Sequence, residues 1–290
     1  MNLCLGTVQF GLDYGISNSN GRPNYDRAKQ IVEFAYQKGI RYFDTANSYG
    51  NSEEILGKIF KSLCINNHVK VISKLPAVFE IDEIEKHIDN SLKLLGLNQL
   101  HGLLLHRPIE RHLYEQLEQK VVELKRNDII NHFGASIYTL DEALEWLKYD
   151  FIDYLQIPCN VLSFDFMKSD FFLMAKEKNK KVFIRSILLQ GLLTMTPSQL
   201  NQKGMDWAKN ELDFLHNFVK SKQLSLKEFA LQFPSTLGNE IIPIIGINTR
   251  SELIETLELI TKKSVSNLTY EEWWSKDLRV SNRLTNPSLW

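Results

Sequence analysis

Short apolar runs alternate along the chain with longer segments whose apolar residues recur every three or four positions. The short runs predict buried strands, and the longer segments predict helices with one apolar face. Asn24 is placed to cap one such helix, with an apolar stripe at positions 28, 31, 32 and 35, and Gly39 ends it before the next strand. We expect eight strands, at 40–44, 69–74, 102–106, 132–136, 152–157, 181–185, 230–233 and 241–245, and helices between them that include 140–148, 165–178 and 204–221.

Strict alternation of strands and helices predicts an α/β protein built as a (β/α)8 TIM barrel, because parallel strands need helical crossovers. Residues 3–11 predict a further strand, and Ser225 with Glu228 predicts a capping box before strand 230–233. Residues 264–290 form a C-terminal tail whose aromatic residues we expect to pack on the barrel: Tyr270, Trp273, Trp274 and Trp290. No linker or low-complexity segment divides the sequence, so residues 1–290 are expected to form a single domain.

The composition, with 43% hydrophobic and 24% charged residues, is that of an ordinary globular protein. A formal net charge of −1 gives no attraction to nucleic acid or to an anionic membrane. The three cysteines, Cys4, Cys64 and Cys159, are too few and too far apart for a disulfide framework or a close-spaced zinc site. With no targeting segment and no apolar stretch of about twenty residues, we expect a cytoplasmic monomer or small homo-oligomer without a metal.

Four polar residues stand at or just after strand ends: Asp44, Tyr49, Lys74 and His106. Each alone has an ordinary explanation as a cap, a loop residue, a surface lysine or a buried histidine, but the carboxyl ends of barrel strands all meet at one face. A phenol can protonate the alkoxide formed when a carbonyl is reduced, provided that a cation stabilises the phenolate. Lys74 would supply that cation, Asp44 would keep it charged, and His106 would orient the substrate oxygen.

These motifs resemble those of the aldo-keto reductases. The matching pieces are Phe-Asp-Thr-Ala at 43–46 with Tyr-Gly at 49–50, Ser-Lys at 73–74 and Leu-Leu-His-Arg-Pro at 104–108, in the family's order and spacing. The resemblance extends to Leu-Gly-Thr at 5–7 and Gln-Gly-Leu-Leu at 190–193, and residues 9–15 resemble a bacterial subgroup associated with carbohydrate pathways. It implies a barrel whose bottom is closed by an N-terminal β-hairpin, with Tyr49 as proton donor, Lys74 and Asp44 as its supports, and His106 orienting the carbonyl of an aldehyde or ketone.

The hydride for this reaction would come from a nicotinamide cofactor, although no Gly-x-Gly-x-x-Gly fingerprint follows a strand. The family binds the dinucleotide in extended form across the barrel mouth. The resemblance assigns this role to Gly6, Thr7, Asp44, Ser136, Gln156, Arg185, Ser186, Leu188, Gln190, Gly191, Gly246, Asn248, Arg250 and Glu252.

The sequence departs from the family's pattern at three of the positions around the cofactor. Arg185 stands where the family often has an aromatic residue under the nicotinamide, and Ile137 replaces a frequent asparagine, leaving the carboxamide to Ser136, Gln156 and Asn160. Glu252 replaces an arginine found in many NADP-dependent members, and it would either contact the ribose or close a capping box with Thr249. We expect NADP first, with Arg250 as the cation for its extra phosphate at a helix start, and NAD as the alternative.

Two other functions fit parts of the sequence. A Schiff-base aldolase or related lyase would use Lys74 as nucleophile, but a neighbouring carboxylate raises the pKa that this chemistry needs lowered. A nucleotide-sensing regulatory subunit would bind the dinucleotide with little turnover. The substrate itself is not fixed, because the loops at 107–112, 160–170 and 187–205 suit sugars, small aldehydes or keto compounds alike.

Overall fold

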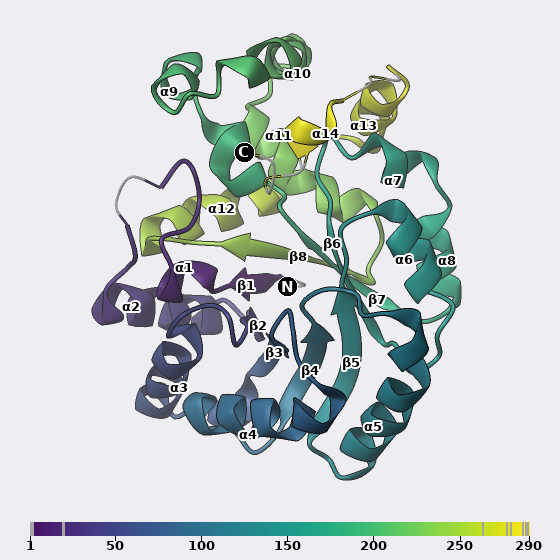
Figure 1. The fold of residues 1–290 in the computed structure, drawn as a ribbon. Coiled ribbons are helices and arrows are strands. Elements are labelled where there is room, and N and C mark those ends of the chain that lie inside the picture. Colours follow the sequence, from purple (N-terminus) through teal and green to yellow (C-terminus); the bar gives the residue numbers. More distant parts are fainter. Residues whose placement is uncertain are drawn as a thin grey trace.

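The computed structural model describes residues 3–18, 21–262, 264–276, 278, 280–285, 287 and 290. Its parallel strands form a closed barrel in which each strand pairs with the next and β8 pairs with β1 (Figure 1). The strands are β1 Cys4–Gly6, β2 Tyr42–Asp44, β3 Lys70–Lys74, β4 Leu100–Leu105, β5 Ile130–Ser136, β6 Tyr154–Pro158, β7 Lys181–Arg185 and β8 Ile241–Gly246. The predicted α/β barrel is therefore confirmed.

Helices surround the sheet and cross over between successive strands (Figure 1). They are α1 Val8–Gly11, α2 Tyr25–Gln37, α3 Ser52–Leu63, α4 Ile84–Leu95, α5 Tyr114–Arg126, α6 Leu140–Trp146, α7 Phe164–Lys168, α8 Phe171–Glu177, α9 Pro197–Gln202, α10 Lys209–Ser221, α11 Leu226–Gln232, α12 Arg250–Lys262, α13 Asn267–Trp274 and α14 Asn282–Thr285. The Asn24 side chain accepts a hydrogen bond from the Arg27 N–H at the start of α2, and the predicted stripe at 28, 31, 32 and 35 is buried. No helix in the described part of the chain is long and apolar enough to cross a membrane.

Two predicted strands differ from those observed. Residues 3–11 do not form a hairpin: β1 lies between β2 and β8 as a barrel strand, and α1 follows it directly. Residues 230–233 are not a strand, because α11 continues through them into a 3-10 turn at Phe233–Thr236. Residues 229–233 are all buried and four of the five are apolar, so this stretch resembles a short interior strand.

Other helix boundaries follow local hydrogen bonds that the periodicity did not reveal. The predicted helix 165–178 is divided into α7 and α8 at Ser169, whose extended backbone interrupts the helix and whose hydroxyl accepts from the Phe171 N–H. Ser225 accepts from the Glu228 N–H as predicted, but the Glu228 carboxylate binds Lys262 and Ser264 instead of closing a capping box. The predicted segment 204–221 begins its α-helix only at Lys209.

Two layers of apolar residues make the core. Seven buried side chains fill the barrel interior: Cys4, Ile72, Leu104, Tyr154, Phe183, Ile242 and Ile244. A larger layer packs between strands and helices, and the C-terminal tail joins it through buried Tyr270 and Trp273. Tyr270 donates to the Phe229 carbonyl at 2.7 Å and the Trp273 indole to the Val161 carbonyl at 2.6 Å, so these tail aromatics pack on the barrel as expected.

Candidate active site

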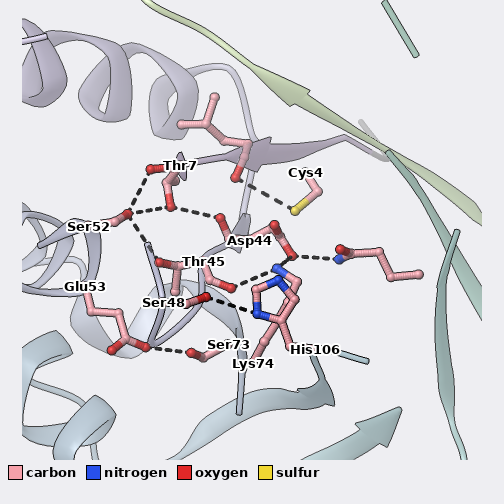
Figure 2. A network of polar contacts seen from close by, with 12 residues as sticks. Cys4, Thr7, Asp44, Thr45, Ser48, Ser52, Glu53, Ser73, Lys74 and His106 are labelled. Atoms are coloured by element: carbon pink, nitrogen blue, oxygen red, sulfur yellow. Dashed lines mark hydrogen bonds and ion pairs between the residues drawn. The ribbon is translucent and has the colours of Figure 1, made fainter. Parts of the chain in front are cut away.

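The carboxyl ends of β2 and β3 place an aspartate and a lysine in direct contact. Lys74 Nζ donates to Asp44 Oδ1 at 2.7 Å and to the Thr45 carbonyl at 2.9 Å, as Figure 2 shows. Both residues are buried, with Lys74 only 1% exposed. Asp44 Oδ1 also accepts from Gln156 Nε2 at 2.7 Å, so β6 holds the carboxylate from across the barrel. Burial of this ion pair excludes solvent screening and fixes the ammonium group in one place.

Tyr49 lies on the short loop between β2 and α3, above the ion pair. Lys74 Nζ lies 4.8 Å from the centroid of the Tyr49 ring, and the His106 ring meets that ring edge-on with centroids 5.9 Å apart. The loop packs so closely against α1 that a Cβ at Gly11 would lie 1.7 Å from the Tyr49 carbonyl oxygen. Only glycine permits this approach, which sets the position of the phenol.

A buried hydrogen-bond network holds the same loop at both ends (Figure 2). Ser52 Oγ donates to the Thr7 carbonyl at 2.9 Å and accepts from Thr45 Oγ1 at 3.2 Å. The buried Glu53 carboxylate accepts from Ser73 Oγ at 2.5 Å and from a second serine hydroxyl, that of Ser91, at 2.8 Å. Such networks rigidify a site when their members are satisfied.

His106 follows β4 and is held by a loop hydroxyl. Its Nδ1 lies 3.0 Å from Ser48 Oγ (Figure 2). Burial, together with the charges of Lys74, Arg185 and Arg107, lowers the pKa of His106 to about 4. The imidazole is therefore neutral at pH 7 and has one N–H to donate.

The pKa values of the Tyr49 phenol and the Lys74 ammonium group are both raised, which keeps both groups protonated at neutral pH. Burial raises the pKa of Tyr49 above its ordinary value, and the nearby Lys74 charge offsets only part of that rise. Burial alone would lower the pKa of Lys74, but Asp44 and Tyr49 together outweigh burial and raise it. The Lys74 charge thus favours the phenolate relative to burial alone, while the resting phenol stays protonated at neutral pH.

A cavity opens in front of these residues at the barrel mouth. Most of the residues assigned from the sequence line it: Gly6, Thr7, Asp44, Tyr49, Gln156, Arg185, Ser186, Leu188, Gln190, Gly191, Gly246, Asn248 and Glu252. Four assigned residues do not, namely Lys74, His106, Ser136 and Arg250. Lys74 lies behind Asp44 and His106 beside Tyr49, whereas the Arg250 guanidinium lies 4.9 Å from the Phe34 ring centroid and is exposed.

The far part of the cavity is lined by residues that the resemblance assigned to a dinucleotide. Two buried acceptors in its wall, Gln9 Oε1 and Asn248 Oδ1, have no hydrogen-bond partner in the described chain. Ser186, Gln190 and Gly191 adopt positive φ in the loop after β7, which turns its backbone along the cavity. Unpaired buried acceptors are costly unless a ligand satisfies them, so the donor groups of a dinucleotide fit this wall.

At the start of α12, Glu252 forms hydrogen bonds with the two residues that precede the helix. The Glu252 carboxylate accepts from the Asn248 N–H at 2.8 Å, and the Glu252 N–H donates to Thr249 Oγ1 at 3.1 Å. Half of the predicted capping box is therefore present: Thr249 accepts from the Glu252 N–H, but the carboxylate accepts from the residue before Thr249.

Comparison with known proteins places this site in a family. Residues 2–273 match the model of the Aldo/keto reductase family. The chain belongs to that family. L-galactose dehydrogenase of Arabidopsis thaliana is 26% identical over 82% of this chain and 79% of that protein. A putative voltage-gated potassium channel subunit beta of Schizosaccharomyces pombe is 27% identical over 87% of this chain and 84% of its own.

Solved structures agree on the fold. The glycerol dehydrogenase of Gluconobacter oxydans superposes with a TM-score of 0.72 at 19% identity, over 97% of this aldo/keto reductase and 94% of that chain. At this identity the likeness concerns the barrel alone. The family is one of oxidoreductases that typically use NAD(P)H, and the relatives do not resolve a subgroup.

The sequence reasoning missed several residues of this cavity. Tyr14, Gly15, Ser17 and Asn18 line it although they belong to the polar segment after α1. The Ile16 N–H donates to the Gln190 carbonyl at 3.0 Å, which fastens this segment across the loop that follows β7. The aromatic and small residues at 14–17 were a possible signal, but the contact joins positions far apart in sequence.

Proposed function

We propose that this aldo/keto reductase reduces an aldehyde or ketone to an alcohol, with Tyr49 as the general acid. The observation that carries the proposal is the buried Lys74–Asp44 ion pair, 2.7 Å long, directly beneath the phenol at the edge of the cavity. Such a pair has no structural need at a cavity edge, since buried ion pairs contribute little net stability. It suits a reaction in which a proton leaves the phenol.

A bound nicotinamide would supply a hydride to the carbonyl carbon. Tyr49 gives its proton to the carbonyl oxygen, and Lys74 stabilises the phenolate that remains. Asp44 keeps Lys74 charged, and the Gln156 amide holds the carboxylate in place. The neutral His106 donates its remaining N–H to the substrate oxygen when Ser48 donates to Nδ1.

We propose NADP as the preferred cofactor, with Arg250 as the cation for its additional phosphate. Glu252 is engaged by the Asn248 N–H, and Arg250 forms no ion pair with any described residue. The N-terminus of α12 adds free N–H groups that favour an anion. The backbone of Gly6, Thr7 and Gly246, the loop 186–191 and the acceptors Gln9 and Asn248 would hold the rest of the dinucleotide.

The two alternatives are less well supported. A Schiff-base reaction needs a neutral amine, but Lys74 is buried, ion-paired and raised in pKa. A regulatory subunit with little turnover would use the same cavity to bind the cofactor and would not need Tyr49 as a general acid. One relative is named as a putative potassium channel subunit, which is why we keep the regulatory alternative. Measuring turnover of carbonyl substrates distinguishes the two functions.

The deciding experiment follows NADPH and NADH oxidation on a panel of aldehydes and ketones, with wild type, Tyr49→Phe and Tyr42→Phe. Tyr42 is the matched control, because it is a phenol in contact with a lysine, Lys181, but it does not line the cavity. Reduction that disappears only with Tyr49→Phe supports the proposal. Tight cofactor binding without turnover on any substrate supports the regulatory alternative, and an amine adduct trapped by borohydride supports the lyase.

A further inference from the structure

Arg185 is a cation in the cavity without a counter-ion. It is the last residue of β7, half-buried, and it lines the same cavity as Tyr49. One N–H donates to the Ile137 carbonyl at 3.3 Å, and the guanidinium lies 4.6 Å from the Tyr138 ring centroid. No ion pair of Arg185 is found within the described residues, although a guanidinium has five N–H groups to donate.

The neighbouring acidic groups are already engaged. Asp44 Oδ1 accepts from both Lys74 and Gln156. At the other edge of the cavity the Glu252 carboxylate accepts from a backbone N–H, and Lys227 pairs with Glu255 at 2.7 Å. None of these carboxylates neutralises Arg185.

The reactive end of the cavity therefore carries an excess positive charge. Lys74 and Asp44 cancel, His106 is neutral at pH 7, and burial raises the pKa of both cavity phenols, Tyr14 and Tyr49, above the ordinary value. The Arg185 charge lies close enough to oppose the rise at both phenols and to lower the pKa of His106. A neutral carbonyl substrate has no group that needs this second cation.

We propose that the natural substrate carries a small anionic group, a carboxylate or a phosphate ester, which pairs with Arg185 while the carbonyl oxygen meets Tyr49 and His106. A guanidinium prefers such groups because its planar N–H fork matches two of their oxygens. The inference rests on the proposed reductase function and adds the substrate class. Tyr14, beside Arg185 in the cavity wall, offers a neutral donor to the same anion.

The test uses two matched pairs of substrates. Succinic semialdehyde against butanal varies a carboxylate, and glyceraldehyde 3-phosphate against glyceraldehyde varies a phosphate, so the pairs also tell the two anions apart. We expect wild type to favour the anionic member of at least one pair in kcat/KM by about ten- to a hundredfold, the usual size of a charge-assisted contact. The KM of that member should rise with salt.

Variants locate the effect. Arg185→Gln should raise the KM of the anionic substrate far more than its kcat, and far more than either constant of the neutral partner. Arg185→Lys should retain part of the preference, because the charge remains without the fork. Arg107→Gln is the matched control, because the Arg107 guanidinium also lies near Tyr138, 5.8 Å from the ring centroid, but Arg107 is exposed and does not line the cavity.

The outcomes separate this inference from the function beneath it. Equal use of both members of each pair by wild type overturns the inference and leaves the reductase proposal standing. An Arg185→Gln variant that loses the same factor on both members, with weaker NADPH binding by fluorescence titration, also overturns it and assigns Arg185 to the cofactor. No reduction of any of the four substrates or of the wider aldehyde panel overturns the reductase function, and this inference with it.

Discussion

Each end of the barrel holds tyrosine, lysine and histidine side chains in contact. At the carboxyl ends of the strands these are Tyr49, Lys74 and His106. At the amino ends, Lys181 Nζ lies 3.3 Å from the Tyr42 hydroxyl, and His101 Nε2 lies 3.1 Å from a second phenol oxygen.

The two clusters differ in how their charges are held. Lys74 is buried and paired with a buried aspartate at the edge of a cavity, whereas Lys181 is half-buried and lies over the faces of aromatic rings, 5.6 Å from that of Tyr42. The carboxylate at the amino ends, Asp153, pairs instead with Lys125 at 2.6 Å. Residue types alone therefore do not make a catalytic site. We propose that the buried, fixed cation at the cavity edge makes the difference, because low dielectric strengthens its effect on a nearby phenol.

The largest expected effect contrasts the two phenols. Tyr49→Phe should lower kcat/KM about 10²- to 10⁴-fold, the usual contribution of one general acid, and leave NADPH binding nearly unchanged. Tyr42→Phe also removes a phenol beside a lysine but should leave kcat/KM close to wild type. Steady-state kinetics with an aldehyde that wild type reduces give kcat/KM, and a cofactor titration gives the NADPH affinity. A Tyr49→Phe enzyme with wild-type rate would show that another group supplies the proton.

The next contrast concerns the lysines and stability. Lys74→Met leaves Asp44 as a buried charge without its partner and should cost about 3–5 kcal/mol in the free energy of unfolding. Lys181→Met removes only cation–π and weak hydrogen-bond contacts at a half-buried position and should cost under about 1 kcal/mol. Urea unfolding of both variants measures the difference. Equal losses would mean that the burial of Lys74 does not set its energetic role.

The sequence predicted the position of a site residue where that residue stands at the end of a single recognisable strand. Asp44, Lys74 and His106 each follow an apolar run directly, so the strand predicts their position, and barrel geometry brings them to one face. A strand was predicted within residues 3–11, but the resemblance assigned it to a hairpin at the barrel bottom, whereas β1 pairs with β2 and β8 inside the barrel. The end of α11 was misread because residues 229–233 are all buried and mostly apolar, and so short an apolar run does not distinguish a helix from a strand.

The rest of the site depends on contacts between distant segments. Ser48 and His106 are 58 positions apart, and Gln156 reaches Asp44 across 112. Nothing in either local sequence predicts these pairings, which follow from how the barrel closes. The isolation of Arg185 is of the same kind, since it depends on which carboxylates other residues already occupy.

A smaller effect is expected at the start of α12, where we propose that the extra phosphate of NADP binds. Arg250→Ala should weaken NADP far more than NAD, by roughly 1.5–3 kcal/mol or about ten- to a hundredfold in affinity. Glu252→Arg should move the preference further toward NADP. Titration of both cofactors measures this. Wild type that binds NAD at least as tightly as NADP, with Arg250→Ala unchanged toward either, would reject the choice of NADP.

The smallest expected effect is a pH dependence of stability that arises at the amino ends of the strands. Burial, together with the charges of His132, Lys70 and Lys181, lowers the pKa of His101 to about 3, against about 6.5 in an unfolded chain. Between these values the unfolded state binds the extra proton, so the contribution of His101 is complete above about pH 6.5 and is lost as the pH falls toward 3. His101→Phe removes this dependence and the hydrogen bond to Tyr154, and the loss of the hydrogen bond is a constant offset. The urea midpoint of wild type should therefore fall relative to that of His101→Phe from pH 7 to pH 4.5, whereas exposed His68→Gln should follow wild type throughout. Parallel curves for wild type and His101→Phe would show that the imidazole is not held neutral by its surroundings.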